Sequence, residues 1–473
     1  MGESEQRHAG RGPTGGHRCG LACRLKKKPF KRRIFFFSIV LVLIAALCVC
    51  AMLVVRSIQE HHGLAAVSEP SVALGSTDSQ ASARRLSATV SYVDIASGEA
   101  PTTTSVSWDD DWFFQDPTIY NHELATTCAV LSAIANAESD YYQMGSDVPA
   151  YMEEALAALG FDSVTTESYR YRSEVVDEVL DAVTNGTDVV AYSLATKRLR
   201  ASDGRERTLV MVAVRGSYGS EWISNVNLGS SAARDRGDSS SSDASWDSSD
   251  HLGFSTAARS VVEDVGARVA ELEAQGRDVA LLFCGHSRGG AIANLSAAYA
   301  DTIANERHAL APLEAIYAYT FATPEVTLST DTDNDLYGNI FNVLNPSDLV
   351  PRFPLEAWGY HRYGANVWLP ADGDEGFDEA YGRMRECYRR NVGEESPSEP
   401  ADRAKVDELV EKFARDIPSV SDIAQPRALW SIATGLLHDI DVVRVLYSHY
   451  PSTYIAWMQA STPADLTVER VEG

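Results

Sequence analysis

The spacing of hydrophobic positions changes several times along the chain, and its first feature is an unbroken apolar segment. Residues 34–55 carry no charge over 22 positions. As a helix this segment would extend roughly 33 Å, against a hydrocarbon layer of about 30 Å. Helices of soluble proteins are usually polar on one side, so an all-round apolar segment of this length predicts a membrane-spanning helix.

The charges that flank residues 34–55 predict its orientation. Six Lys/Arg occupy positions 26–28 and 31–33 just before it, whereas only Arg56 and then Glu60 follow closely. Basic residues favour the cytoplasmic side, so we expect the N-terminus in the cytoplasm and the rest of the chain outside. A cleaved signal peptide is the alternative, but its apolar region is usually about 7–15 residues long, and no good small-x-small cleavage site follows closely. We therefore expect a retained signal anchor and a single-pass protein of the cell membrane.

After the anchor comes a stretch of weak periodicity. Residues 56–107 are rich in Ser, Ala, Thr and Gly, a composition typical of a flexible linker. From residue 108 the pattern is denser, and apolar positions from Leu124 to Ile134 recur at the helical spacings of three and four. We expect residues 108–473 to form one domain.

Short apolar runs rich in β-branched residues alternate with helical patterns through the middle of this domain. This alternation is typical of βαβ units and predicts an α/β fold with a mainly parallel sheet flanked by helices. Two stretches break the alternation: residues 229–250 are a Ser/Asp-rich loop too polar to bury, and residues 375–438 have the pattern of helical insertions. The expected strands are residues 189–194, 209–214, 279–283, 316–321, 340–344 and 366–369, and the expected helices include 152–159, 257–275 and 289–305.

Composition says more about which partners the chain can bind than about its fold. Apolar residues make up 45% of the chain and charged residues 23%, which is ordinary for a globular protein, but the net charge is −25. Residues 1–33 hold ten Lys/Arg and two Glu, so this expected cytoplasmic tail is near +8 and the remainder is near −33. An acidic body repels a phosphate backbone, which argues against nucleic acid as a partner.

Cysteine usage gives no sign of a disulfide framework. Of seven cysteines, only Cys128, Cys284 and Cys387 lie beyond the apolar N-terminal segment, and three is an odd number. A Cys128–Cys387 bridge is the alternative to free thiols.

One acidic stretch resembles a calcium loop at first sight. Asp331, Asp333 and Asp335 alternate as calcium ligands do, but Leu336 stands where such a loop needs Gly, and Asn342 stands where it needs Glu. We interpret this stretch as a solvated turn and expect neither a metal nor a cofactor.

A nucleophile motif lies where an expected strand meets an expected helix. The sequence GHSRG at residues 285–289 fits the pattern G-x-S-x-G directly after the apolar run 279–283. The pattern alone is weak, but a strand–turn–helix setting exposes such a serine above a sheet, which indicates that Ser287 is a nucleophile. The backbone N–H of Arg288, at the start of the helix, would then face a developing oxyanion. We expect His286 to point elsewhere from the tight turn and to be structural.

Four sequence blocks stand out in this region: LVMVAVRGSYGSEWISNV from residue 209, HLGFSTAARSVVEDV from residue 251 followed by GHSRGG, IYAYTFATPEV from residue 316, and NPSDLVPRFP from residue 345. They resemble blocks of the class 3 lipase family of α/β-hydrolases, in the family's order. The likeness covers roughly residues 120–460 and implies an α/β-hydrolase fold. It implies that Asp348 is the acid of a Ser-Asp-His triad and that Ser217 is the second oxyanion donor, and it puts residues 218–228 at the place of the family's lid helix. Asp348 also follows an expected strand and comes after Ser287, as this fold requires.

The histidine of the triad must follow Asp348, which leaves three candidates. His361 comes just before the strand-like run 366–369, whereas the triad histidine should come after it, so we interpret His361 as structural. His438 lies in a helical pattern beside two aspartates. His449 lies in a turn that opens a final helix, and its sequence HYPSTY is similar to a C-terminal block of bacterial members of the family. We favour His449.

Together these assignments predict an extracytoplasmic serine hydrolase that cleaves carboxylic esters, of lipids or acylglycerols, through an acyl-enzyme. His449 would remove the Ser287 proton, and Asp348 would orient the imidazole. An acyltransferase or a thioesterase would use the same triad. A non-catalytic surface-binding module on a hydrolase fold is the third hypothesis.

Overall fold

The structure, a computed structural model, describes residues 72–73, 84–93, 101–144, 150–170, 190–216, 249–423 and 425–469. All of them lie in the compact unit His62–Gly473, which is separate from the unit Met1–His61. The predicted anchor at residues 34–55 lies outside the described residues, and so do Ser217 and the lid position at 218–228. Among the helices that the structure describes, none is long and apolar enough to cross a membrane.

A sheet of nine strands forms the centre of the described residues, in the order β1-β4-β5-β6-β7-β8-β9-β10-β11. Strands β6 to β10 pair in parallel, and the strands on either side pair antiparallel. The predicted α/β fold with a mainly parallel centre is confirmed, and β8 and β9 have the predicted bounds. The strands are β1 Val72–Ala73, β4 Ser163–Thr165, β5 Tyr192–Arg200, β6 Glu206–Val214, β7 Val279–His286, β8 Ile316–Phe321, β9 Ile340–Leu344, β10 Ala365–Trp368 and β11 Thr467–Glu469.

Side chains of the parallel strands alternate between two cores, one on each face of the sheet. In β6 the odd-numbered residues from Leu209 to Ala213 belong to one buried cluster, and the even-numbered residues from Val210 to Val214 belong to the other. A strand segment that is covered on both faces has no polar side, which is why residues 209–214 of β6 are an unbroken apolar run in the sequence.

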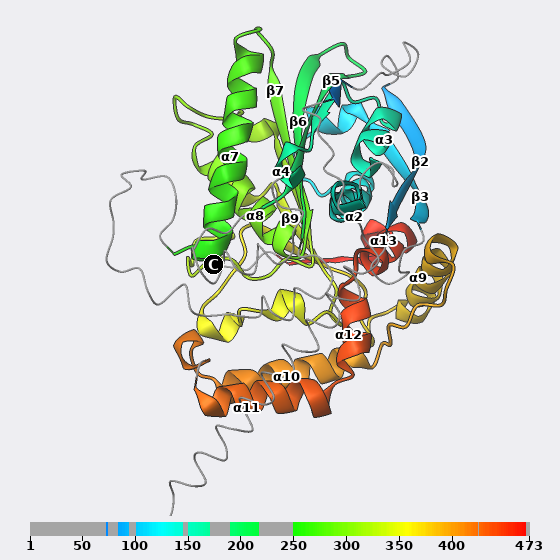
Figure 1. The fold of residues 1–473 in the computed structure, drawn as a ribbon, viewed down its shortest axis with the longest axis vertical. Helices are drawn as coiled ribbons and strands as arrows, with labels where there is room; N and C mark the ends of the chain where they lie inside the picture. Colours follow the sequence, from blue (N-terminus) through cyan, green and yellow to red (C-terminus); the bar gives the residue numbers. More distant parts are fainter. Residues whose placement is uncertain are drawn as a thin grey trace, which may run out of the picture. The chain divides into compact units, whose positions relative to one another are not determined.

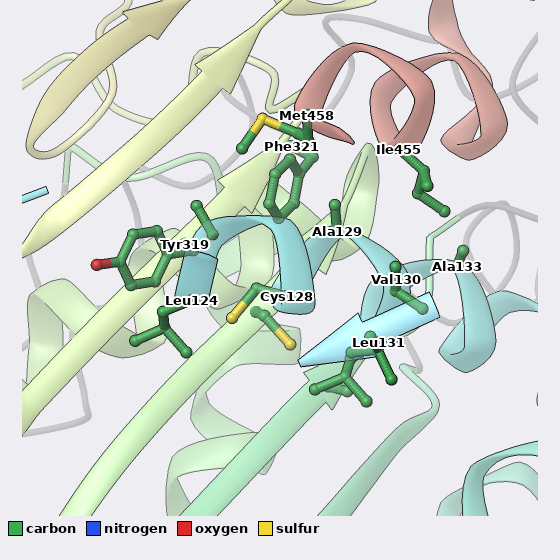
Figure 2. Close-up of a cluster of buried hydrophobic side chains, with 14 of the residues drawn as sticks. Leu124, Cys128, Ala129, Val130, Leu131, Ala133, Tyr319, Phe321, Ile455 and Met458 are labelled. Atoms are coloured by element: carbon green, nitrogen blue, oxygen red, sulfur yellow. The ribbon is translucent and has the colours of Figure 1, made fainter. Parts of the chain in front are cut away.

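Helices cover both faces of this sheet (Figure 1). Residues of α2, α3, α9 and α13 build the first core, and residues of α7 and α8 build the second. Figure 2 shows part of the first core, where Cys128 of α2 lies among residues of β8 and α13 such as Phe321 and Met458. Cys128 and Cys387 are buried free thiols, so the alternative disulfide between them is not formed. The helices are α2 His122–Met144, α3 Tyr151–Ala158, α4 Glu167–Arg170, α7 Leu252–Glu273, α8 Arg288–Thr302, α9 Phe377–Val392 and α13 Pro451–Ala460.

The linker prediction is wrong for two segments, because β2 (Arg85–Val93) and β3 (Pro101–Asp109) form an antiparallel pair. Every second residue of this pair faces the first core, and Tyr92 and Trp108 are fully buried there. The Ser and Thr residues that suggested a linker are compatible with a strand, because Thr is β-branched and fits a half-buried pleated surface. The contacts of β2 and β3 with the rest of the unit favour the strand pair over a flexible linker.

Residues 375–438 contain helices, as predicted, and the elements beyond α9 pack around a small core of their own. This third core contains Leu355 from the loop after β9, Leu409 and Phe413 from α10, and Val445 from α12. The elements are α10 Asp402–Asp416, α11 Pro426–Thr434, a π-helical turn Gly435–Asp439 and α12 Val442–His449.

Candidate active site

Ser287 lies at the sharp turn between β7 and α8. The strand ends at His286 and the helix begins at Arg288, which leaves Ser287 with φ 58° and ψ −129°. A non-glycine residue in this region is strained, and such strain persists only where surrounding contacts hold it. One such contact is the Ser287 N–H, which donates to the Phe321 carbonyl of β8 at 2.8 Å. The turn therefore holds the serine at the carboxyl edge of the parallel strands.

The two glycines that flank the turn are required by close backbone approach. A Cβ on Gly285 would lie 2.3 Å from the carbonyl oxygen of Gly289, and a Cβ on Gly289 would lie 2.4 Å from the carbonyl oxygen of Val214. Either atom would force α8 away from β6 and β7. The G-x-S-x-G pattern therefore describes packing as well as the position of the serine.

The structure brings Ser287, Asp348 and His449 together. His449 Nδ1 lies 2.8 Å from Asp348 Oδ2, and His449 Nε2 lies 3.0 Å from Ser287 Oγ. A carboxylate only accepts, so Nδ1 carries the proton, and Nε2 is then free to accept from the serine hydroxyl. All three side chains are buried. This is the arrangement in which an imidazole acts as a general base on a serine.

The other two candidate histidines lie elsewhere. His438 is exposed in the π-helical turn, and His361 is held by backbone hydrogen bonds with Val326 and Thr327. His449 is the last residue of α12, and Pro451 opens α13 directly after it. Of the three, only His449 contacts the serine and the aspartate.

Donors from two elements hold the Asp348 carboxylate. The Tyr454 hydroxyl of α13 donates to Oδ2 at 2.9 Å, and the Val350 N–H donates to Oδ1 at 2.9 Å. The Asn345 N–H in turn donates to the Tyr454 oxygen at 3.0 Å. Burial, and then the Asp348 charge, raise the pKa of Tyr454, so its hydroxyl stays protonated and keeps donating. The sequence analysis had not assigned Tyr454 a role.

Residues 211–358 match the profile of the family described as lipase (class 3). This part of the chain is similar to the class 3 lipases. The matched residues include the end of β6, the serine turn and the loop that carries Asp348, but not His449.

Individual proteins to which the chain is similar are lipases by name. The secreted mono- and diacylglycerol lipase 1 of Fusarium solani is 28% identical over 186 residues, which cover 37% of this chain and 48% of that protein. The chain therefore spans about half the length of that curated relative. Among solved structures, a triacylglycerol lipase whose catalytic centre is a serine protease triad has 20% identity and a TM-score of 0.28, over 38% of this chain and 62% of its own. A lipase from Rhizopus microsporus var. chinensis has 19% identity and a TM-score of 0.28, over 43% of this chain and 73% of its own.

The expectation that His286 points away from the site is wrong. Its Nε2 lies 2.7 Å from the His449 carbonyl oxygen, and the two imidazole rings have their centroids 4.8 Å apart. A carbonyl only accepts, so Nε2 carries the proton. Burial, and then the neighbouring His449, hold the pKa of His286 well below its usual value, so the ring is neutral. His286 faces the site because it is buried at the end of β7, where His449 packs against it.

The expected oxyanion donors are only partly described. Arg288 is the first residue of α8, at the positive end of the helix dipole. Ser217 lies outside the described residues, but the preceding Gly216 is described. Its N–H donates to Asn136 Oδ1 of α2 at 2.7 Å, and a Cβ on Gly216 would lie 3.5 Å from the Ser287 Cβ. Asn136 is buried in α2, and its place in the sequence gave no sign of this contact.

No cluster of His, Cys, Asp or Glu suited to a metal ion occurs in the part of the chain that the structure describes. Asp331 accepts a hydrogen bond from Asn334 at 2.9 Å, and Asn334 caps the short 3-10 helix Asp335–Tyr337. This stretch is a turn in the structure.

Proposed function

We propose that this chain is a serine hydrolase that cleaves carboxylic esters, with Ser287 as nucleophile, His449 as general base and acid, and Asp348 as the acid of the triad. The observation that carries the proposal is the continuous hydrogen-bonded row from Asp348 through His449 to Ser287, at 2.8 and 3.0 Å. A serine hydroxyl is a weak nucleophile at neutral pH and needs such a base within hydrogen-bond distance.

The reaction follows from this row. His449 Nε2 takes the Ser287 proton while Oγ bonds to the ester carbonyl carbon, and Asp348 stabilises the imidazolium that forms. The oxyanion accepts from the backbone N–H of Arg288 and from Ser217. His449 then gives the proton to the leaving alcohol as the ester bond breaks. In the second half of the reaction, His449 takes a proton from water while the water oxygen bonds to the acyl carbonyl carbon. The acid is released as the bond to Ser287 Oγ breaks and His449 returns the proton to Oγ.

Lipid or acylglycerol esters are the substrates that we propose. The support is the class 3 lipase profile over residues 211–358 and the relative that is named a mono- and diacylglycerol lipase. We propose that the site lies outside the cytoplasm and that residues 34–55 anchor the chain in the membrane. The chain would then be a membrane-anchored lipase of the bacterial type. The support for the anchor is the uncharged segment and the six basic residues before it.

The test is hydrolysis of p-nitrophenyl esters of short and long acyl chains by the full chain in detergent micelles. Ser287→Ala and His449→Ala are each expected to lower kcat at least 10³-fold while the protein stays folded. His438→Ala is the matched control and is expected to keep full activity. Ser287 is also expected to react with a fluorophosphonate probe in the wild type.

Other outcomes separate the alternatives. An inert wild type that a fluorophosphonate does not label would support the non-catalytic binding module. Faster turnover of thioesters, or acyl transfer to an added alcohol in place of hydrolysis, would support the thioesterase or the acyltransferase.

A further inference from the structure

Large hydrophobic side chains are exposed together at one place on the helical insertion. Leu429 and Trp430 of α11 are 49% and 61% exposed, Leu437 of the π-helical turn is 74% exposed, and Val443 of α12 is 59% exposed. Four of the eight exposed large hydrophobic residues that the structure describes thus fall within residues 429–443. Single exposed apolar residues are ordinary on a protein surface, but a concentration of them marks an interaction site.

Helical spacing gathers most of these residues on one side. Leu429, Trp430, Leu437 and the exposed Ala433 recur at spacings of three and four, so they lie along one stripe of α11 and the turn that follows it. We call these four residues the apolar ridge.

The apolar ridge is not needed to hold α11 in place, because the helix already buries another face. Ala428, Ser431 and Gly435 are buried there, and a Cβ on Gly435 would lie 2.5 Å from Leu409 Cδ1 of α10. Ile432, on the same side, packs against the third core. An ordinary surface helix is polar opposite its buried face, whereas α11 is apolar on both.

The charge around the ridge favours a lipid surface. Residues 426–438 (PRALWSIATGLLH) contain no Asp or Glu, although the whole chain has a net charge of −25, and they contain Arg427 and His438. The next carboxylate, Asp439, accepts from Lys412 at 2.6 Å. Helices that lie in a membrane interface combine Trp and Leu with basic rather than acidic neighbours.

The helices around the apolar ridge are connected both to His449 and to the loop after Asp348. After the turn, α12 leads directly to His449, and Arg444 of α12 donates twice to Asp402 of α10 at 2.6 Å. On the other side, Trp358 in the loop after Asp348 donates through Nε1 to the Ile417 carbonyl that ends α10, at 2.7 Å. Figure 1 shows α11 beside α10, with α12 rising from them to α13.

We propose that the apolar ridge docks the catalytic unit on the surface of a phospholipid bilayer, with Trp430 and Leu437 entering the headgroup and upper acyl region. The proposal rests on the proposed function for its purpose, because docking would bring lipid esters to Ser287. The contact itself does not require hydrolysis.

The first measurement is quenching of tryptophan fluorescence in Ser287→Ala full chain reconstituted in vesicles that contain brominated phosphatidylcholine. The Trp430→Phe substitution removes the contribution of Trp430 to the quenching, and we expect this contribution to be substantial. Quenching that is identical in both proteins would overturn the proposal.

The second measurement compares two substrates with otherwise wild-type protein. Trp430→Ser/Leu437→Ser is expected to lower hydrolysis of diacylglycerol embedded in vesicles at least tenfold and to leave hydrolysis of soluble p-nitrophenyl butyrate unchanged. The control is Ile119→Ser, which removes an equally exposed (67%) apolar side chain before α2 and is expected to change neither rate.

The outcomes separate this proposal from the proposed function. Quenching of Trp430 without any ester hydrolysis by the wild type would leave docking intact and refute the hydrolase. An equal loss on both substrates, or an equal effect of Ile119→Ser, would overturn docking. So would a dimer in detergent that the ridge substitutions dissociate, because the ridge would then be covered by a second copy of the chain.

Discussion

At the scale of single residues, the position of His449 depends on hydrogen bonds to its backbone as well as to its ring. His286 Nε2 donates to the His449 carbonyl, and Asn345 Nδ2 donates to the carbonyl of the preceding Ser448 at 2.8 Å. These donors come from the ends of β7 and β9, the same edge that carries Ser287 and Asp348. Small errors in the placement of a catalytic base are costly, because catalysis requires aligned reacting groups.

His286 is therefore predicted to be a positioning residue. His286→Leu leaves the buried His449 carbonyl without its donor, and kcat for ester hydrolysis is expected to fall about 10–100-fold with little change in KM. His286→Gln places an amide N–H near the former Nε2–H and is expected to recover part of the loss. Steady-state kinetics over pH 5–9 test this, since a shifted base also changes the pH profile.

A purely structural role would give a different result. If His286→Leu lowers activity only in proportion to the fraction of protein unfolded, and His286→Gln behaves like His286→Leu, the contact with His449 has no catalytic effect.

At the scale of elements, the β2–β3 hairpin is an integral part of the unit. Trp108 of β3 stacks on Phe113 with ring centroids 5.2 Å apart, meets Phe161 edge-on at 5.1 Å, and has Lys197 Nζ 5.4 Å from its ring centre. Its indole N–H donates to Asp110 at 2.8 Å, so the ring is buried with its polar atom satisfied. The hairpin thus closes the first core on the side of α2 and α3.

Trp108→Ala is expected to destabilise the protein by about 3–5 kcal/mol, the usual cost of removing a fully buried aromatic side chain. Thr103→Ala, at an exposed position of the same strand, is the control and is expected to change stability by less than about 0.5 kcal/mol. Urea unfolding of the full chain in detergent measures both. Equal, small effects would mean that this segment behaves as the linker that its composition suggested.

At the scale of the whole molecule, burial raises the pKa of two carboxyl groups of this acidic chain. Glu138 of α2 is fully buried, and one of its oxygens accepts from the Met152 N–H at 2.8 Å. Burial raises the pKa of Glu138 from 4.5 to about 8. Burial also raises the pKa of Glu325 to about 7, partly offset by Arg362 at 2.9 Å.

These raised pKa values predict a loss of stability on the alkaline side. The folded protein keeps a proton on Glu138 that the unfolded chain releases above about pH 4.5, so this contribution is full below that pH and is lost as the pH rises toward 8. Glu138→Gln keeps an acceptor for the Met152 N–H and has no proton to lose. Relative to the wild type, it is expected to gain on the order of 3 kcal/mol in unfolding free energy between pH 5 and pH 8.

Denaturant unfolding at the two pH values tests this prediction. Glu263→Gln, an exposed substitution on α7, is the control and is expected to leave the difference between the two pH values unchanged. A wild type and a Glu138→Gln variant with parallel pH dependence would contradict it.

The local pattern of the sequence was enough for the parts of this protein whose physics is local. The mainly apolar runs predicted β8 and β9 with their bounds, because strands covered on both faces have no exposed polar side. The strand–turn–helix setting of GHSRG predicted the turn at Ser287, because its glycines are required by contacts within a few residues of the serine and with the neighbouring strand.

Only the tertiary structure decided the parts that depend on residues far apart in the chain. Three histidines followed Asp348, and the hydrogen bond that distinguishes His449 joins residues separated by 162 positions. The contacts of His286, Asn136 and Tyr454 likewise join residues at least 80 positions apart, and the pairing of β2 with β3 became visible only through the core that the two strands cover. Spacing along a sequence specifies periodicity, but it carries no record of which distant side chains the closed sheet brings within 3 Å of one another.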